Sequence, residues 1–292
     1  MIITKLIGGL GNQMFQYAAG RRVAITNKTE LKLDVSGYNQ QVGITPRKYM
    51  LDIFNIRASI ATRQEIQFFT NQSKNRIQRN FHRIKLTVLQ RQYILQKSTH
   101  FTYDFLTIPD NSYLDGYWGS EKYFLDIGDI IRNDFTLKKN PDKVNSELIR
   151  YIKNCNSVSI HVRRNDYVKN QKTHDFHGVC GIRYYRKAVS VIMKKVRDPT
   201  FFIFSDDPDW CKAHLRFNYP TTHVTNNLGK NDCEDMRLMS ECKHNIIANS
   251  SFSWWGAWLN NNPDKIVIAP KKWFRDSSIY TQDIIPDTWI LL

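Results

Sequence analysis

Short apolar segments alternate with amphipathic ones through the second half of the chain. From residue 155 onward, runs of β-branched or aromatic residues are followed by stretches whose apolar positions recur every three or four residues. Runs of the first kind are typical of buried strands, and stretches of the second kind of helices that cover a sheet. The pattern predicts strands at 157–163, 201–204, 222–225, 245–248 and 265–268, and helices at 183–196, 209–215, 233–243 and 251–260. This alternation predicts a doubly wound parallel sheet.

The first 34 residues predict a β-α-β unit. A strand at 2–7 leads into the turn Gly8-Gly9-Leu10-Gly11-Asn12, and a strand at 30–34 follows the helix. The inner face of that helix is expected to carry Met14, Phe15, Ala18, Ala19 and Val23. Residues 35–125 are less regular, and the polar run 138–146 predicts a linker into the second half.

The glycine-rich turn matches a dinucleotide-binding fingerprint only in part. Met14 stands at the position of the third glycine, although Asp34 lies about where a ribose-binding acid would stand. Such a turn lets a phosphate approach the amides of a helix N-terminus, or it serves only as a tight turn. The sequence leaves both interpretations open.

The formal net charge of +15 indicates an anionic partner. Nucleic acid, an anionic membrane surface and a phosphorylated small molecule all qualify, but no RNA-recognition motif or zinc finger accompanies the charge, which disfavours nucleic acid. Residues 66–103 contain no acid, and their basic residues are Lys74, Arg76, Arg79, Arg83, Lys85, Arg91 and Lys97. The apolar residues between them predict a basic amphipathic helix, either bound to a membrane or solvated.

The N-terminus lacks the pattern of a signal peptide, and no apolar run is long enough to span a bilayer. We therefore expect a cytoplasmic protein, either free or peripheral at the inner face of the membrane. The five cysteines are widely spaced with no C-x-x-C pair, so we expect reduced thiols and neither disulfides nor a metal site.

Polar and charged residues follow three of the predicted strands. They are Arg163, Arg164 and Asp166 after the first strand, Ser205, Asp206 and Asp207 after the second, and Asn249, Ser250, Ser251 and Ser253 after the fourth. Ligands bind beyond the carboxyl ends of strands in an open parallel sheet. Guanidinium suits phosphate oxygens, carboxylates accept from a base or a ribose, and a helix N-terminus favours an anion. The set predicts a site for a nucleoside diphosphate.

Each group also has a purely structural interpretation. Arg163, Arg164 and Asp166 can form a surface ion pair, while Ser205 or Asp206 can cap the following helix. The aromatic segments 45–54 and 113–124 either line a carbohydrate-binding cleft or pack in the core. We expect Trp254, Trp255 and Trp258 to be packing residues.

At these residues the chain resembles the bacterial α-1,2-fucosyltransferases of glycosyltransferase family 11. The resemblance covers nearly the whole chain and rests on GGLGNQMFQYAAG, RKYMLDIF, GYWGSEKYF, HVRRNDYV, FIFSDD, ECKHNIIANSSFSWWGAWL and APKKWF. The most specific of these motifs are HVRRNDYV and NSSFSWWGAWL, the second half of the sixth segment. One departure is Asn165, where the family often has glycine.

The resemblance implies a GT-B-like α/β fold of two Rossmann-like domains that face a central cleft. The acceptor-side domain would span 1–145 and carry the basic segment, and the domain that binds the nucleotide sugar would span 146–292. It further implies inverting transfer of fucose from GDP-β-L-fucose to the 2-hydroxyl of a galactose-containing glycan, such as a lipid-linked O-antigen repeat. No obligatory metal is implied.

The resemblance also implies roles for the site residues. Arg163 would neutralise the β-phosphate, with Arg164 in support, and His161 with Asp206 or Asp207 would recognise the nucleoside. Further donors to GDP would come from Gly9, Gly11, Asn12, Asn249, Ser250, Ser251 and Ser253.

The base for the acceptor hydroxyl stays open between Asp166 and the loop expected at 173–180, which holds His174, Asp175 and His177. An acid beside two arginines has a lowered pKa, which favours an orienting role for Asp166. Two other functions compete with α-1,2 fucosyl transfer. One is GDP-fucose-dependent transfer with another linkage or acceptor, and the other is non-catalytic binding of nucleic acid or membrane by a basic α/β protein.

Overall fold

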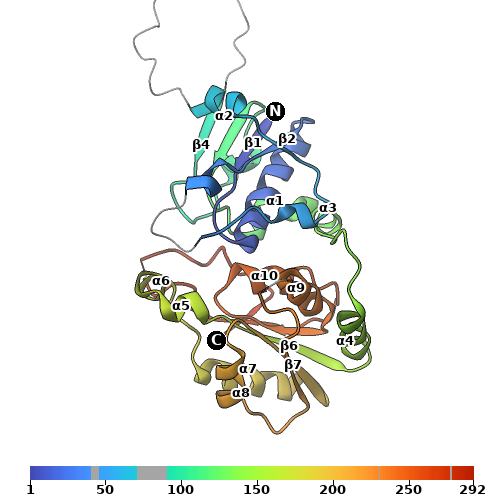
Figure 1. The fold of residues 1–292 in the computed structure, drawn as a ribbon. Helices are drawn as coiled ribbons and strands as arrows, with labels where there is room; N and C mark the ends of the chain where they lie inside the picture. Colours follow the sequence, from blue (N-terminus) through green and yellow to red (C-terminus); the bar gives the residue numbers. More distant parts are fainter. Residues whose placement is uncertain (41–45, 71–90, 230, 277) are drawn as a thin grey trace, which may run out of the picture. The chain divides into compact units, whose positions relative to one another are not determined.

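The chain divides into two compact units, Met1–Lys138 and Lys139–Leu292, in the computed structural model (Figure 1). The structure describes residues 1–40, 46–70, 91–229, 231–276 and 278–292. Most of the predicted basic amphipathic helix, at 71–90, lies outside the described residues. The expected domain boundary after residue 145 falls inside helix α4 (Lys143–Lys153), which belongs to the second unit.

The first unit is built on a parallel sheet with the strand order β3-β2-β1-β5-β4. Its strands are β1 (Ile2–Lys5), β2 (Leu31–Asp34), β3 (Ser59–Ile60), β4 (Gln92–Leu95) and β5 (Ser112–Asp115). Its α-helices are α1 (Leu10–Thr26), α2 (Arg63–Thr70) and α3 (Gly128–Asp134). Short 3-10 helices complete it: η1 (Ser36–Gln40), η2 (Leu51–Ile53), η4 (Tyr103–Thr107), η5 (Glu121–Tyr123) and η6 (Leu125–Ile127).

Helix α1 is almost wholly buried in the first unit, and the five residues predicted for its inner face are all in the core. The side chains of Ile3 and Tyr113 pack with Phe69 of α2. Asp34 is not a free ribose acceptor, because it is buried and accepts hydrogen bonds from the Tyr113 hydroxyl at 2.6 Å and the Ser36 amide at 2.8 Å.

The second unit contains a parallel sheet with the order β11-β10-β9-β6-β7-β8, which confirms the predicted doubly wound sheet. Its strands are β6 (Asn156–Val162), β7 (Pro199–Ser205), β8 (Thr221–Val224), β9 (His244–Ile246), β10 (Val267–Ala269) and β11 (Ile290–Leu291). After α4, its helices are α5 (Asn165–Lys169), α6 (Gln171–His177), α7 (Ile182–Lys195), α8 (Pro208–His214), α9 (Asp232–Glu241) and α10 (Ser251–Trp258). Helices α9 and α10 lie on one side of β6 and β7, and α7 and α8 on the other (Figure 1).

The central strand β6 is buried on both faces, as a parallel strand between two helical layers should be. Val158, Ile160 and Val162 pack against α7. On the opposite face, the Ser159 hydroxyl accepts a hydrogen bond from the side chain of Asn245 at 2.8 Å. The tryptophans of α10 are packing residues, as expected, and all three are buried.

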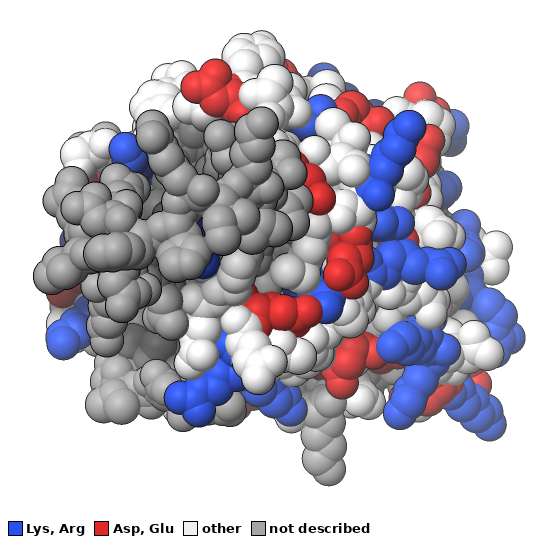
Figure 2. Space-filling model, turned by 90° about the horizontal axis from the view of Figure 1, so that it is seen from above, with Lys and Arg blue, Asp and Glu red and all other residues white. Residues whose placement is uncertain are grey.

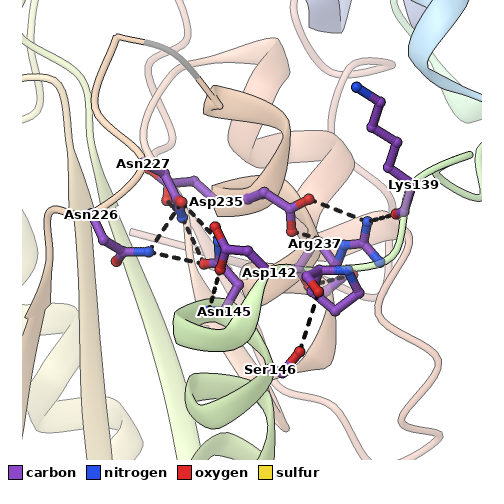
Figure 3. Close-up of polar contacts among 11 residues, drawn as sticks. Lys139, Asp142, Asn145, Ser146, Asn226, Asn227, Asp235 and Arg237 are labelled. Atoms are coloured by element: carbon purple, nitrogen blue, oxygen red, sulfur yellow. Dashed lines mark hydrogen bonds and ion pairs between the residues drawn. The ribbon is translucent and has the colours of Figure 1, made fainter.

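A cluster of polar side chains fastens α4 to the sheet of the second unit (Figure 3). The asparagine cluster consists of Asn145 on α4, Asn226 and Asn227 after β8, and Asp235 on α9. Asn145 and Asn227 exchange side-chain hydrogen bonds at 3.0 Å, and Asn227 donates to Asp235 at 2.8 Å. Burial is the main cause that raises the pKa of Asp235 to about 7.

None of the described helices combines the length and the apolar character that crossing a bilayer requires. On the face shown in Figure 2, Lys and Arg side chains are interspersed with Asp and Glu over the described residues.

Candidate active site

The register of β6 and β7 brings the arginines to the acidic residues. Val162 pairs with Ser205, so the residues that follow the two strands are neighbours. The Arg163 guanidinium lies 2.8 Å from Asp166 Oδ1 and 3.1 Å from Asp206 Oδ2. The Arg163 guanidinium therefore joins two of the predicted groups of polar residues, the one that follows β6 and the one that follows β7.

Arg164 is held by three contacts beside Arg163. Its amide donates to Asp206 at 2.8 Å, its Nε lies 3.1 Å from Asp207 Oδ2, and its guanidinium stacks 4.0 Å from the ring of Trp210. Asp207 is also the N-cap of α8, because it accepts from the Trp210 amide. The cap of α8 is thus Asp207, and not Ser205 or Asp206 as the structural interpretation had it, and both Asp207 and Arg164 make supporting contacts.

The Arg163 side chain keeps about a quarter of its surface, 24%, open to solvent. Burial lowers the pKa of Arg163, but the charges of Asp206 and Asp166 outweigh it and raise the pKa overall. Its charge is therefore permanent and its direction is fixed by two carboxylates, which suits it to an oxygen that gains negative charge.

The segment after Asn165 is helical, whereas the sequence analysis expected a loop at 173–180. Asn170 caps α6 by accepting from the Thr173 amide at 3.1 Å, and Gly178 ends that helix with a φ of +65°. Asparagine before a helix and glycine after it are the ordinary signals of its two ends, and they were overlooked. Of the rival base candidates there, His174 and Asp175 face Arg275, with Arg275 Nη1 3.2 Å from His174 Nδ1.

His177 lies against the arginine cluster. Its ring stacks on Tyr167 with centroids 4.6 Å apart and nearly parallel planes, and Tyr167 in turn lies under the Arg163 guanidinium. Burial lowers the pKa of His177 to about 4, opposed by the Asp166 charge and assisted by that of Arg163. The imidazole is therefore neutral at pH 7.

His161 is buried on β6 beside Phe252, with ring centroids 5.6 Å apart. Burial, assisted by the Arg163 charge, lowers its pKa to about 3. Its Nδ1 has no hydrogen-bond partner among the described residues. A neutral, buried ring nitrogen without a partner is a candidate for recognition of a ligand.

The third strand-end group serves mainly to build the loop before α10. The Asn249 amide donates to the backbone carbonyls of His177 at 2.9 Å and Trp273 at 3.2 Å, and the Ser253 hydroxyl donates to the carbonyl of Ser250. Asn249 and Ser253 are buried and already bonded, so they support the loop. Ser250 and Ser251 remain at the start of α10, where Ser250 makes no side-chain cap and first-turn amides suit an anion.

The second unit thus holds a fixed guanidinium at Arg163 and neutral imidazoles at His161 and His177. Asn249 joins the end of α6 to the residues before α10, whose first turn offers backbone amides. The sequence model of the family described as Glycosyl transferase family 11 matches residues 1–292. The chain belongs to glycosyl transferase family 11. This confirms the resemblance found in the motifs.

Relatives of this family 11 glycosyltransferase match over nearly its full length. It is 35% identical to an α-1,2-colitosyltransferase of Escherichia coli over 99% of this chain and 98% of that one. It is 34% identical to the O-antigen biosynthesis glycosyltransferase WbnK of Escherichia coli, over 98% and 99%. A galactoside 2-α-L-fucosyltransferase of Mus musculus, Sec1, is 30% identical over 38% of this chain and 30% of its own.

The fold of the glycosyltransferase is similar to that of Arabidopsis thaliana FUT1, with a TM-score of 0.53 and 10% identity over 91% of this chain and 69% of that one. With its two parallel α/β units, this confirms the predicted GT-B class.

The glycine turn lies in the first unit, between β1 and α1. Gly9 is the N-cap of α1 and its carbonyl accepts from the amides of Asn12 and Gln13. Gln13 donates to the carbonyls of Gly8 and Lys48, at 3.1 and 2.8 Å, and accepts from the Met50 amide. Gln13 therefore links the glycine turn to the segment RKYM. The motif alone does not predict this contact, because Gln13 and Lys48 are 35 residues apart.

Within the described parts of this glycosyltransferase, no three His, Cys, Asp or Glu side chains are grouped so that they could hold a metal ion. The five cysteines are free.

Proposed function

We propose that this family 11 chain transfers L-fucose from GDP-β-L-fucose to the 2-hydroxyl of a terminal galactose, with inversion and an α-1,2 linkage. The single observation that carries the proposal is the Arg163 guanidinium, fixed between Asp166 and Asp206 at the end of β6 yet partly open to solvent. A planar guanidinium fork suits a phosphate. The galactoside fucosyltransferase among its relatives supports the donor and the acceptor.

In the proposed reaction, the acceptor oxygen forms a bond to the anomeric carbon while the bond from that carbon to the β-phosphate oxygen breaks. The negative charge gained by GDP is neutralised by Arg163, whose direction Asp166 and Asp206 fix. The proton of the acceptor hydroxyl passes to a base, for which Asp166 and His177 are the candidates nearest to Arg163. The proposal includes no obligatory metal.

The nucleoside would be recognised by His161 and Asp206, and the diphosphate by Arg163 and the start of α10 at Ser250 and Ser251. His161 offers an unpartnered Nδ1 for this purpose. Arg164 and Asp207 are assigned a supporting role, because they bond to each other and to α8.

Colitose is the second candidate for the donor sugar, because the α-1,2-colitosyltransferase matches over the full chain. Colitose is fucose without its 3-hydroxyl. A site that hydrogen-bonds this hydroxyl rejects the deoxy sugar strongly, whereas a site that does not contact it accepts both sugars. The ratio of kcat/KM for GDP-fucose and GDP-colitose therefore separates the two functions.

We propose a lipid-linked O-antigen repeat as the natural acceptor, at the inner face of the cytoplasmic membrane. The relative named for O-antigen biosynthesis supports this acceptor. The basic segment 66–103 supports peripheral attachment by its charge.

The test is acceptor-dependent release of GDP from GDP-fucose, with lactose as the acceptor and with and without EDTA. We expect turnover that survives EDTA and that Arg163→Ala reduces by about 10²-fold or more. A wild-type protein that binds no GDP in calorimetry would contradict the proposal. Binding of GDP without turnover of GDP-fucose, but with turnover of GDP-colitose, would replace fucose by colitose.

A further inference from the structure

The aromatic segment 113–124 contains a constrained turn directly after β5. A Cβ atom added to Gly116 would lie 2.4 Å from the Cβ of Gln96, so the position has no room for a side chain. Trp118 has a φ of +50°, a conformation that costs a bulky residue about 1–2 kcal/mol. The side chain of Gln96 accepts from the amides of Tyr117 at 2.8 Å and Trp118 at 3.0 Å. The turn therefore holds Tyr117 in one backbone conformation.

Tyr117 is presented to solvent by this turn. It is 53% exposed, whereas Trp118 is buried and packs on Phe105 with ring centroids 4.8 Å apart. Burial nevertheless is the main cause that raises the pKa of the Tyr117 hydroxyl, with the Lys5 charge lowering it and the Asp115 charge raising it. The ring of Tyr117 is therefore open to solvent, and the charges of Lys5 and Asp115 act on its hydroxyl.

Charged and polar groups lie at the carboxyl ends of β1 and β5, and β5 leads into this turn. Lys5 Nζ lies 2.9 Å from Asp115 Oδ2, which also accepts from the Tyr93 hydroxyl. Lys5, which ends β1, and Asp115, which ends β5, thus lie beside the chain segment that carries Tyr117.

We propose that Tyr117, Lys5 and Asp115 form the subsite that binds the terminal galactose of the acceptor, an inference that rests on the proposed function. The C–H face of a pyranose stacks on an exposed aromatic ring, and its hydroxyls need both donors and acceptors. Lys5 supplies donors and Asp115 supplies acceptors, and their charges cancel, which suits a neutral sugar. A ring already fixed by its turn loses little entropy on binding.

The test compares Tyr117→Ala with Tyr117→Phe, which keeps the ring. Tyr103→Ala is the matched control, since Tyr103 is 79% exposed on the same unit. We expect Tyr117→Ala to raise the acceptor KM about tenfold and to leave the GDP dissociation constant unchanged, while Tyr117→Phe and the control stay within about threefold of wild type. An unchanged acceptor KM in Tyr117→Ala, or a parallel loss of GDP affinity, would overturn the inference, the second because the ring would then stack on the nucleotide.

A second measurement separates this subsite from the proposed donor. Saturation-transfer NMR with a β-galactoside and nucleotide-free protein should give a signal in the wild type that Tyr117→Ala and Lys5→Met lose. Failure to bind GDP would refute the proposed function and leave this signal intact. No signal from the wild type, or one that survives in Tyr117→Ala, would refute the acceptor subsite.

Discussion

Asp166 Oδ1 lies 2.8 Å from the Arg163 guanidinium, in a pair three residues apart whose side chains are both largely shielded from water. A carboxylate that pairs with a guanidinium fixes the direction in which its partner points. The same guanidinium reaches Asp206, so its direction is determined from two strand ends at once.

Replacing Arg163 by lysine keeps the positive charge and removes the fork that contacts both carboxylates. We expect kcat for fucosyl transfer to fall about 10²-fold, because an ammonium is a flexible point charge that no longer holds its position against the leaving phosphate. Arg197→Lys is the control, since the Arg197 side chain is 94% exposed and pairs with the neighbouring Asp198. Equal kcat values for Arg163→Lys and Arg197→Lys would show that Arg163 takes no part in the chemical step.

Replacing Asp166 by asparagine tests whether it orients Arg163 or accepts the proton. An orienting role predicts about a tenfold loss of kcat, similar to that of Asp206→Asn, and a pH profile of unchanged shape. Loss of a general base costs 10²–10⁴-fold and removes the acidic limb of the profile. A much larger loss in Asp166→Asn than in Asp206→Asn would therefore make Asp166 the base.

The asparagine cluster predicts that part of the protein's stability falls as the pH rises. The folded-state pKa of Asp235 is about 7, above its value in the unfolded chain of about 4, so between these values the folded state binds the extra proton. Its unfavourable contribution appears as the pH rises from about 4 and is complete above about 7. Asp235→Asn should therefore be more stable than wild type at pH 8, by on the order of 2 kcal/mol, and about equal at pH 4. Urea unfolding at both pH values measures this, and a wild type that is the more stable at pH 8 would contradict it.

His177 predicts the opposite effect, a free energy of unfolding that rises with pH over much of the same pH range. Its folded-state pKa of about 4 is below the unfolded value of about 6.5, so the unfolded state binds the extra proton and stability is lost as the pH falls from 6.5 towards 4. His177→Phe keeps an aromatic ring against Tyr167 and removes this loss. The stability of His177→Phe relative to wild type, measured from denaturant midpoints, should therefore be higher at pH 5 than at pH 7.5. Loss of activity beyond tenfold in His177→Phe, with stability retained, would instead identify His177 as the base.

The basic segment predicts binding to anionic membranes from its charge alone. Replacing Lys74, Arg76, Arg79 and Arg83 with glutamine removes four charges worth about 1 kcal/mol each near an anionic surface. We expect weaker cosedimentation with phosphatidylserine-containing vesicles and unchanged turnover of lactose. Binding that does not change would remove the membrane attachment from the proposed function.

The periodicity of apolar residues was sufficient for β6 to β10 and for α7 to α10 of the second unit, because each buries a face against its neighbours and thus needs the corresponding spacing. It also showed that Arg163, Asp206 and Ser250 follow strands, and parallel strands bring such residues to one edge. It did not show α6, whose apolar residues are few and whose signals are only its capping Asn170 and the terminal Gly178.

What the sequence by itself determined is the family and the parallel α/β architecture, because motif and periodicity are local properties of the chain. Only the tertiary structure decided what each polar residue does. The register of β6 against β7 pairs Arg163 with Asp206 and Arg164 with Asp207, and burial commits Asn249 and Ser253 to loop contacts. Those roles depend on which strands become neighbours and which side chains lose water, and neither follows from a residue's position in the chain.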